Sequence, residues 1–193
     1  MPRSDNLYEL PNDLPAPHDD GACGHLAGMR LPPVSLPSTH GQPVDLSALP
    51  GGTIVYCYPR TGRPDEDPLP GWDAIPGARG CTPQSCAFRD HYSEIIALGI
   101  DRVFGLSSQD SAYQLEAAQR LHLPFALLSD EKLELARALA LPTFEIQGLT
   151  LIKRLTMVLR AGTIEHVFYP VFPPDTHAPG VIHWLVERTT VGR

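Results

Sequence analysis

The chain has 193 residues, of which 42% are hydrophobic, and a formal net charge of −7 at pH 7. This length fits one domain with a full core. The negative charge argues against nucleic acid as a main partner, and no apolar run is long enough to span a bilayer.

The chain begins with a stretch rich in proline, glycine and acidic residues that shows no hydrophobic period. We interpret residues 1–28 as an N-terminal arm that lies on the domain or is partly disordered, and residues 29–193 as the domain itself. Residues 1–12 contain no hydrophobic run of the secretory type, so we expect a cytoplasmic protein whose thiols stay reduced. Cys23, in the arm, is interpreted as an incidental surface thiol.

The first predicted elements are extended. Two short pieces at 34–36 and 44–46 flank a turn and predict a β-hairpin. A nearly continuous β-branched and aromatic run at 53–58 predicts a strand covered on both faces, with Cys57 in the core. After it, residues 60–80 form a long connection rich in proline and glycine. Connections of this length are commonly functional or mobile, and we interpret this one as a lid beside the residues that follow, or else as a tolerated surface insertion.

The next stretch has the sequence GCTPQSC, from Gly80 to Cys86, and opens a helix predicted over 82–98. Its proline suits the first turn, and an apolar stripe follows. Because unpaired N–H groups and the helix dipole favour an anion at this end, Cys81 is predicted to lose its proton easily and to act as a nucleophile. Arg79 and Arg89 add positive charge nearby in the sequence. The alternative interpretation is that both cysteines are ordinary buried core residues.

The second half of the chain alternates strands and helices. Strands are predicted at 102–108 and 125–130, and helices at 111–122, 133–141 and 175–190. Between the last two helices, extended runs at 149–159 and 163–172 predict a hairpin with glycine at its turn. The alternation implies parallel strands with crossover helices, and the hairpin adds antiparallel strands. The predicted fold class is therefore α/β, with a mixed central sheet flanked by helices on both faces.

The cysteine motif in this context resembles the peroxiredoxins, and most of all their Q-type, or bacterioferritin-comigratory-protein, group. The matching segments are Tyr58-Pro59, residues 80–90, Gly105-Leu106-Ser107, residues 127–130, Arg154 and residues 162–168. The resemblance covers roughly residues 28–187. It implies a thioredoxin-like fold with an N-terminal extension, and a thiol peroxidase that reduces hydrogen peroxide and organic hydroperoxides with no cofactor or metal.

The resemblance also implies a role for individual residues. Cys81 would attack the peroxide and become a sulfenic acid, and Cys86 would resolve it to an intramolecular disulfide. Arg154 would hold the thiolate form and donate hydrogen bonds to the peroxide. The family usually carries threonine or serine three residues before the reactive cysteine, where this chain has an alanine. Thr61 is our candidate for the missing hydroxyl if the long insertion loops out behind it, and Thr82 is the alternative.

Helix geometry adds a prediction of motion. Residues five apart in an intact helix have Cα atoms about 8.7 Å apart, whereas a disulfide needs less than about 7 Å. The first turn or two must therefore unwind before Cys81 and Cys86 can join. A dithiol protein such as thioredoxin or glutaredoxin would then reopen the disulfide. We expect a monomer or a weak homodimer.

Three alternatives stay open at this point. A thiol–disulfide oxidoreductase on the same fold usually has two residues between its cysteines, and this chain has four. A zinc site could use Cys81, Cys86 and a histidine such as His91, although no second close pair of ligands follows. A redox sensor or chaperone would use the same thiol for signalling.

Overall fold

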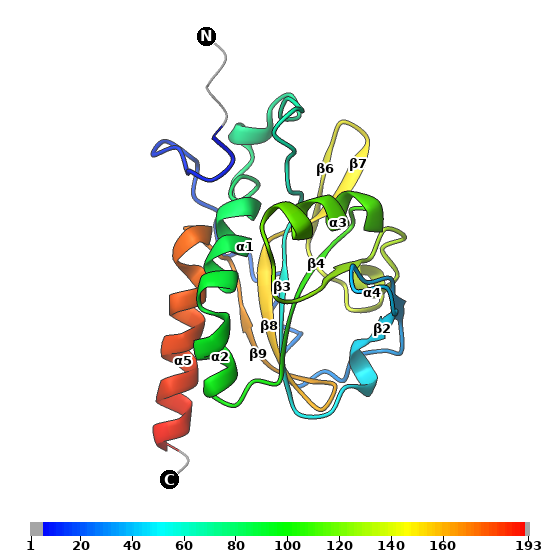
Figure 1. The fold of residues 1–193 in the computed structure, drawn as a ribbon, viewed down its shortest axis with the longest axis vertical. Coiled ribbons are helices and arrows are strands. Elements are labelled where there is room, and N and C mark those ends of the chain that lie inside the picture. Colours follow the sequence, from blue (N-terminus) through cyan, green and yellow to red (C-terminus); the bar gives the residue numbers. More distant parts are fainter. Residues whose placement is uncertain (1–5, 192–193) are drawn as a thin grey trace.

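The central sheet has five strands in the order β5–β4–β3–β8–β9 in the computed structural model, which describes residues 6–191 (Figure 1). Its strands are β3 (Gly52–Cys57), β4 (Arg102–Ser107), β5 (Leu127–Ser129), β8 (Leu155–Arg160) and β9 (Thr163–Phe168). β3 pairs with β4 in parallel and with β8 in antiparallel, and β8 pairs with β9 in antiparallel. The mixed α/β sheet predicted from the element order is confirmed.

Helices and short hairpins surround this sheet. The helices are α1 (Cys81–Asp90), α2 (Tyr92–Ala97), α3 (Ser111–Arg120), α4 (Glu134–Ala138) and α5 (His177–Val191), with 3-10 turns η1 (Leu46–Ala48), η2 (Trp72–Ala74) and η3 (Pro174–Thr176). Two hairpins are formed by β1 (Ser35–Leu36) with β2 (Val44–Asp45) and by β6 (Thr143–Ile146) with β7 (Leu149–Ile152). Along the part of the chain that the structure describes, no helix combines the length and apolar character needed to cross a membrane.

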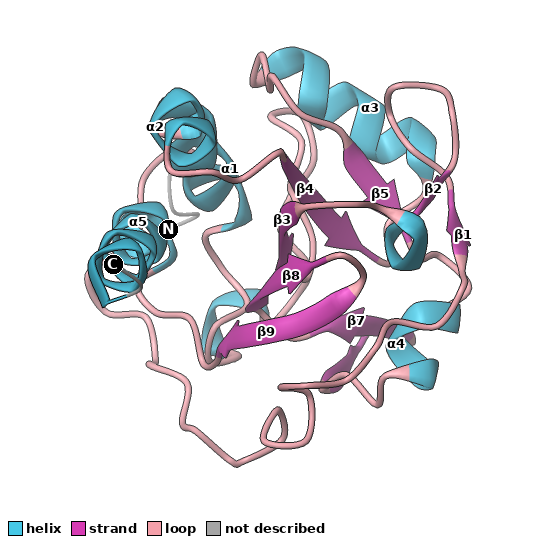
Figure 2. Ribbon diagram, turned by 90° about the horizontal axis from the view of Figure 1, so that it is seen from below, coloured by secondary structure: helices cyan, strands magenta, loops and turns pink. Residues whose placement is uncertain are grey.

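The alternation of side chains along β3 divides the core into two layers. All six residues of β3 are buried, and neighbouring side chains point to opposite faces. Ile54 and Tyr56 pack with residues of α1, α2, α3 and α5. Val55 and Cys57 pack on the other face with the arm, the β1–β2 hairpin and α4. Figure 2 shows α1, α2 and α5 on one side of the sheet and α4 on the other. The prediction that this strand is covered on both faces, with Cys57 in the core, is therefore confirmed.

The helix predicted over 82–98 is two helices. The first starts one residue earlier, at Cys81, and ends where His91 leaves helical values with φ −99° and ψ 7°. The N–H of His91 is shared between the carbonyls of Ala87 and Arg89, which ends α1 before α2 begins. No proline or glycine marks this break in the sequence, so the apolar period alone did not indicate it.

The extended run predicted over 149–159 is also two elements. β7 ends at Ile152 and pairs with β6, which was not predicted, whereas β8 begins at Leu155 and pairs with β3. Both strands are apolar, so the sequence pattern does not show where the partner changes. The β6–β7 turn consists of Gln147 and Gly148, both with positive φ (49° and 76°). Asparagine or aspartate before the glycine would have been the stronger turn signal.

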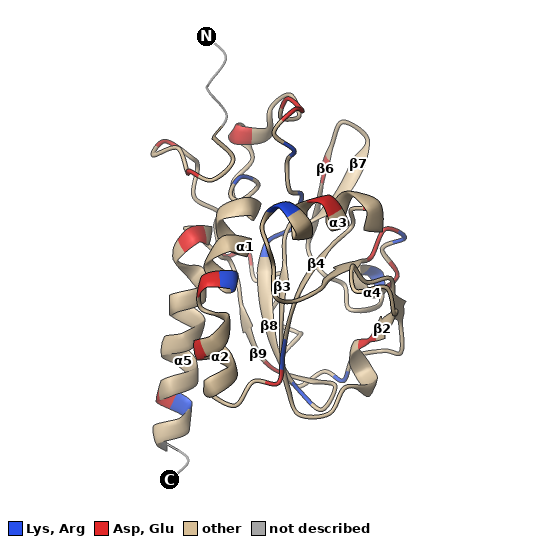
Figure 3. Ribbon diagram, in the orientation of Figure 1, with Lys and Arg blue, Asp and Glu red and all other residues tan. Residues whose placement is uncertain are grey.

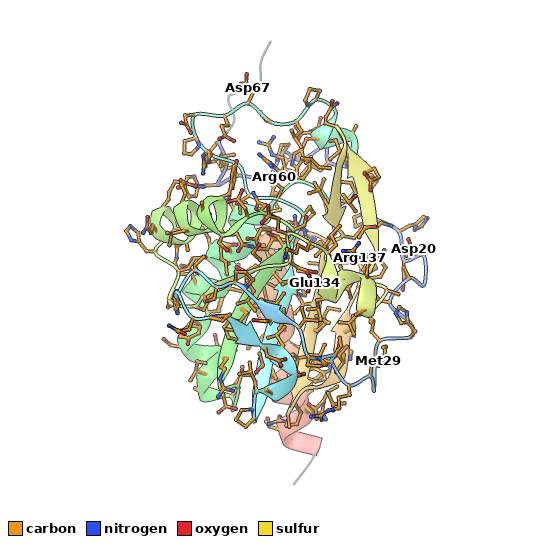
Figure 4. The ribbon with its side chains drawn as sticks, turned by 90° about the vertical axis from the view of Figure 1, so that its right-hand side faces the viewer. Asp20, Met29, Arg60, Asp67, Glu134 and Arg137 are labelled. Atoms are coloured by element: carbon orange, nitrogen blue, oxygen red, sulfur yellow. The ribbon has the colours of Figure 1, made fainter. Side chains whose placement is uncertain are left out.

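The interpretation of Cys23 as a surface thiol is wrong. Its side chain is only 7% exposed and lies in the same core layer as Leu26 and Cys57. The arm is fixed there by a hydrogen bond from the N–H of Gly28 to the carbonyl of Ile164 (2.8 Å). Figure 4 labels Asp20 of the arm and Met29, the residue that directly follows the arm, along one side of the molecule. The apolar residues of the arm have no period, so no pattern in the sequence indicates their burial.

Candidate active site

Helix α1 begins at Cys81 because Gly80 adopts a backbone conformation that other residues rarely take, with φ 106°. A Cβ atom at this position would lie 2.4 Å from Cγ of Pro174 and 2.8 Å from Cδ2 of Leu10, so only glycine fits. Cys81 follows at once and is 2% exposed. Its sulfur therefore lies at the helix end where unpaired N–H groups favour a negative charge.

Arg154 reaches Cys81 from the sheet, just before β8. Its Nη2 donates to Sγ of Cys81 at 3.1 Å and to the carbonyl of Ala78 at 3.1 Å. Nη1 donates to Oε1 of Gln84, and Nε donates to the carbonyl of Gly77 at 3.3 Å. The guanidinium is 3% exposed, so its charge is poorly screened by solvent. The structure thus brings together two predicted site residues that lie far apart in the sequence.

A pocket opens onto Cys81 between α1, α3 and the connection 60–80. It has a volume of about 60 Å³, room for only a few water-sized groups. Both candidate hydroxyl residues, Thr61 and Thr82, line the pocket together with Leu7 of the arm and Trp72 of the connection. Thr61 is fully buried and Thr82 is 3% exposed. The insertion therefore does loop out so that Thr61 comes to the same pocket as Cys81.

The connection 60–80 is packed against the rest of the molecule. Trp72 is 9% exposed and lies in a small core cluster with Ile146 of β6 and Leu151 of β7. Figure 1 shows the connection and the β6–β7 hairpin side by side at one end of the molecule. Near its end, Arg79 forms an ion pair with Asp73 at 3.0 Å. This segment is a wall of the pocket, a position that fits the lid interpretation.

Charged residues of both signs line the pocket. Figure 3 shows positively and negatively charged positions along the connection and on α3. The hydroxyl of Tyr113 donates to Oε2 of Glu66 at 2.6 Å, and Arg60 and Arg63 lie over its ring at 4.7 and 4.1 Å. Burial, followed by the bond to Glu66, raises the pKa of Tyr113 to about 12, so its hydroxyl keeps its proton at neutral pH. Figure 4 labels Arg60 and Asp67 at this end of the molecule. The mixed signs leave the mouth without a dominant charge.

Cys86 lies on the same helix as Cys81 but in different surroundings. Both are free thiols, and Cys86 is about half buried. Burial raises the pKa of Cys86, and the positive charges of Arg89 and Arg120 offset part of this effect. Arg89, which adds positive charge near the motif in the sequence, therefore acts on the second cysteine. Its position near the end of the same helix gave no sign of this.

The other two thiols are poorly suited to reaction. Burial raises the pKa of Cys23 to about 12, and it raises the pKa of Cys57 further above its ordinary value. A thiol that keeps its proton is a weak nucleophile. Within residues 6–191, no three histidine, cysteine or acidic side chains come together as ligands for a metal ion.

His177 of α5 packs beside this site and stays uncharged. Its ring lies edge-on to Phe88 of α1 with ring centroids 5.8 Å apart, and its Nε2 is 2.9 Å from the hydroxyl of Thr156. Burial, with a smaller contribution from the charge of Arg154, lowers the pKa of His177 from 6.5 to about 4. Protonation of this residue therefore opposes folding.

This shift predicts a loss of stability in acid. The unfolded chain binds a proton at His177 near pH 6.5, whereas the folded chain binds it only near pH 4, so stability falls as the pH drops through this window. The free energy of unfolding should fall by roughly 2 kcal/mol more between pH 7.5 and pH 5 than in a His177→Gln variant. Urea unfolding of both proteins at the two pH values measures the difference. Equal losses in both would show that His177 does not contribute.

Sequence reasoning missed several side chains around the pocket. Gln84 lies within the cysteine motif, and the structure shows that it accepts a hydrogen bond from Arg154. Gln109, between β4 and α3, holds Thr61 by hydrogen bonds and was not singled out. Tyr113 and Leu7 also line the pocket and carry no motif. None of these residues stands at a distinctive spacing, so no sequence pattern indicated that they lie at the pocket.

Known proteins resemble this chain in sequence. A family model described as Redoxin matches residues 26–182. Peroxiredoxin Q, chloroplastic, of Triticum aestivum is 34% identical over 158 residues, which is 80% of this chain and 64% of the wheat protein. Peroxiredoxin Bcp of Escherichia coli (strain K12) is 31% identical over 167 residues, which is 84% of this chain and 96% of that protein.

Solved structures show the same fold. Peroxidoxin BcpB of Mycobacterium tuberculosis is similar with a TM-score of 0.67 and 24% identity, covering 84% of this chain and 98% of that chain. Peroxiredoxin Q of Xanthomonas campestris is similar with a TM-score of 0.65 and 23% identity, covering 83% and 97%. The chain thus spans slightly less than two thirds of the wheat relative but nearly the whole of the bacterial ones.

Proposed function

Because this chain belongs to the redoxin family and, within it, to the peroxiredoxin Q/Bcp group, we propose that it is a thiol peroxidase that reduces hydrogen peroxide and organic hydroperoxides. One observation supports this proposal above the others. A cysteine at a helix N-terminus receives a hydrogen bond at 3.1 Å from a buried arginine, and its pocket has room for a peroxide group. A buried donor at the sulfur stabilises negative charge there and supports attack on a peroxide oxygen.

The first step oxidises Cys81. Its thiolate attacks one peroxide oxygen, the O–O bond breaks, and the other oxygen leaves as an alkoxide or hydroxide that takes up a proton. Cys81 becomes a sulfenic acid and the peroxide becomes an alcohol or water. Arg154 is positioned to donate to the sulfur and to the negative charge that develops on oxygen. Thr61, from the same pocket, is our candidate for the hydroxyl that orients the peroxide, and Thr82 is the alternative.

The second step joins Cys81 to Cys86. The thiol of Cys86 attacks the sulfenic sulfur, a disulfide forms, and water leaves. Since helix α1 is continuous through both residues, the Cα atoms start about 8.7 Å apart and the first turns must unwind. The hydrogen bond from the hydroxyl of Tyr56 to Ser85 (3.0 Å) would break in this motion.

An aromatic contact limits how far the unwinding extends. Phe88 is fully buried and stacks on Tyr56 with ring centroids 4.5 Å apart. It therefore fixes the helix just beyond Cys86. In this proposal residues 81–86 leave the helix while the remainder of α1 stays in place. The exposed disulfide is then reduced by an external dithiol protein such as thioredoxin or glutaredoxin.

A kinetic experiment should distinguish the roles of Cys81 and Cys86. A Cys86→Ser variant should react once with peroxide at close to the wild-type rate, because the attacking sulfur and its partners are unchanged. It should then fail to turn over with thioredoxin, since no intramolecular disulfide forms. Stopped-flow oxidation and a coupled thioredoxin assay measure the two steps. Full turnover in this variant would exclude Cys86 as the resolving residue.

Two other functions on the same fold give different results. A thiol–disulfide oxidoreductase would reduce an added disulfide substrate and would not consume peroxide steadily. A redox sensor would be oxidised once and would not need rapid recycling. Steady peroxide consumption that depends on Cys81 therefore favours the peroxidase over both. A cytoplasmic location and a monomeric or weakly dimeric state stay predictions of the sequence.

A further inference from the structure

Gln109 holds Thr61 by three hydrogen bonds across 48 positions of the sequence. Its Oε1 accepts from the backbone N–H of Thr61 at 2.9 Å and from the hydroxyl of Thr61 at 3.1 Å. Its Nε2 donates to the carbonyl of Thr61 at 3.2 Å. Thr61 is fully buried and Gln109 is 6% exposed, so solvent scarcely competes for these bonds. One side chain thus binds both backbone groups and the hydroxyl of a single residue.

Gln109 is itself fixed at the end of β4. Its N–H donates to the hydroxyl of Ser107 at 3.2 Å, and its carbonyl accepts from the hydroxyl of Ser129 at 2.7 Å. Both serines are buried on neighbouring strands. The orientation of the amide is also determined, because the opposite orientation would place its NH₂ group against the N–H of Thr61. Because the sheet holds Gln109 in place, Gln109 fixes the position of Thr61 relative to the sheet.

The direction of the hydroxyl bond decides what Thr61 can offer to the pocket. A threonine hydroxyl has one hydrogen and two lone pairs. Oε1 of Gln109 can only accept a hydrogen bond, so the hydroxyl of Thr61 directs its hydrogen to that atom. Only the lone pairs of the Thr61 hydroxyl then remain to bind another molecule. A hydroperoxide carries a hydrogen on its terminal oxygen. That hydrogen would find an acceptor in Thr61, while Arg154 supplies donors at Cys81.

Resting on the proposed peroxidase function, we propose that Gln109 is a positioning residue, which sets the hydroxyl of Thr61 as the acceptor for the peroxide O–H. The hydrogen bonds from Gln109 are needed because a long connection separates Thr61 from Cys81, and no tight turn holds these two residues together. Gln109 supplies from the neighbouring strand the constraint that the local chain does not provide. The substrate is then recognised as a neutral, protonated hydroperoxide.

The test compares Gln109→Met, Thr61→Val, Thr61→Ser and the Gln109→Met/Thr61→Val double variant. Gln114→Met is the matched control. Gln114 is also buried and donates to Ser107 at 2.9 Å, but no bond joins it to Thr61. The rate constant for oxidation of Cys81 by hydrogen peroxide is measured by stopped flow. Alkylation of the same sulfur by iodoacetamide is measured in parallel, because that reaction needs no acceptor for a peroxide hydrogen.

We expect Gln109→Met and Thr61→Val each to slow peroxide oxidation by about 10-fold to 100-fold while alkylation is unchanged. The double variant should be no slower than Thr61→Val, since both changes remove one function. Thr61→Ser and Gln114→Met should react with peroxide at close to the wild-type rate. A Gln109→Met protein with the wild-type rate, or losses that multiply in the double variant, would overturn the proposal.

The comparison of Thr61→Val with Thr61→Ser remains decisive even where Gln109→Met does not fold. Equal rates in those two variants would show that the hydroxyl, and hence its orientation by Gln109, has no part in the reaction. Failure of the proposed function has a separate signature, since the wild-type protein would then not react with peroxide at all. If the wild type reacts with peroxide and Thr61→Val reacts as fast, the role of Gln109 is wrong while the proposed function stands.

Discussion

A Cys81→Ser variant should lose peroxide consumption by at least about 10³-fold. The hydroxyl of serine stays protonated at neutral pH and is a much weaker nucleophile than a thiolate, so the first oxidation does not occur. The substitution is nearly isosteric, and the buried site should keep its fold. A peroxide assay with thioredoxin and its reductase measures turnover, and circular dichroism checks that the variant is folded.

The matched control for this experiment is Cys86→Ser. It carries the same chemical change on the same helix, yet it should still react once with peroxide. Loss of the single reaction in Cys81→Ser and its retention in Cys86→Ser would assign the attack to the first cysteine. Substantial turnover in folded Cys81→Ser would show that another thiol attacks the peroxide, and the role given to the pocket at Cys81 would be wrong.

Replacing Arg154 with glutamine should slow oxidation of Cys81 by about 10²-fold to 10³-fold. The guanidinium donates to the sulfur and to four oxygens around it, so its loss removes a buried charge and loosens the chain from Gly77 to Arg79. Arg154→Lys should recover little of the rate, because one ammonium group cannot reproduce the fork that reaches Cys81 and Gln84 together. Stopped-flow oxidation under single-turnover conditions measures the rate.

Arg160 offers a control for the change of charge. It ends β8, the strand that Arg154 precedes, and its side chain is 51% exposed and does not line the pocket, so Arg160→Gln should oxidise at the wild-type rate. An Arg154→Gln protein that is folded and reacts as fast as wild type would contradict the role given to the guanidinium. A general loss in both variants would point to net charge, not to position.

The central part of the site could be predicted because it depends on local rules and a specific motif. A proline in the first turn and the apolar stripe place Cys81 at a helix start, and the structure has the helix begin there. The pairing of this residue with Arg154 came from the resemblance to a family, since no pattern in the sequence joins positions so far apart. The structure places the two side chains 3.1 Å apart.

What could not be predicted depends on tertiary contacts without a sequence period. The burial of Cys23 follows from how the arm crosses the sheet, and nothing in its composition indicates this. The division between β7 and β8 is a change of partner within one apolar run. Gln109 meets Thr61 only because β4 lies next to β3, and a lone glutamine carries no motif.

The proposed roles of Cys81 and Cys86 are tested most directly by oxidising the reduced protein with one equivalent of hydrogen peroxide and mapping its tryptic peptides under non-reducing conditions. The proposed mechanism predicts that the tryptic peptide from Gly80 to Arg89, which contains both Cys81 and Cys86, loses two hydrogen atoms as an internal disulfide, while Cys23 and Cys57 stay reduced. A Cys81 that remains a free thiol, or a disulfide that joins it to Cys23 or Cys57, would contradict this mechanism.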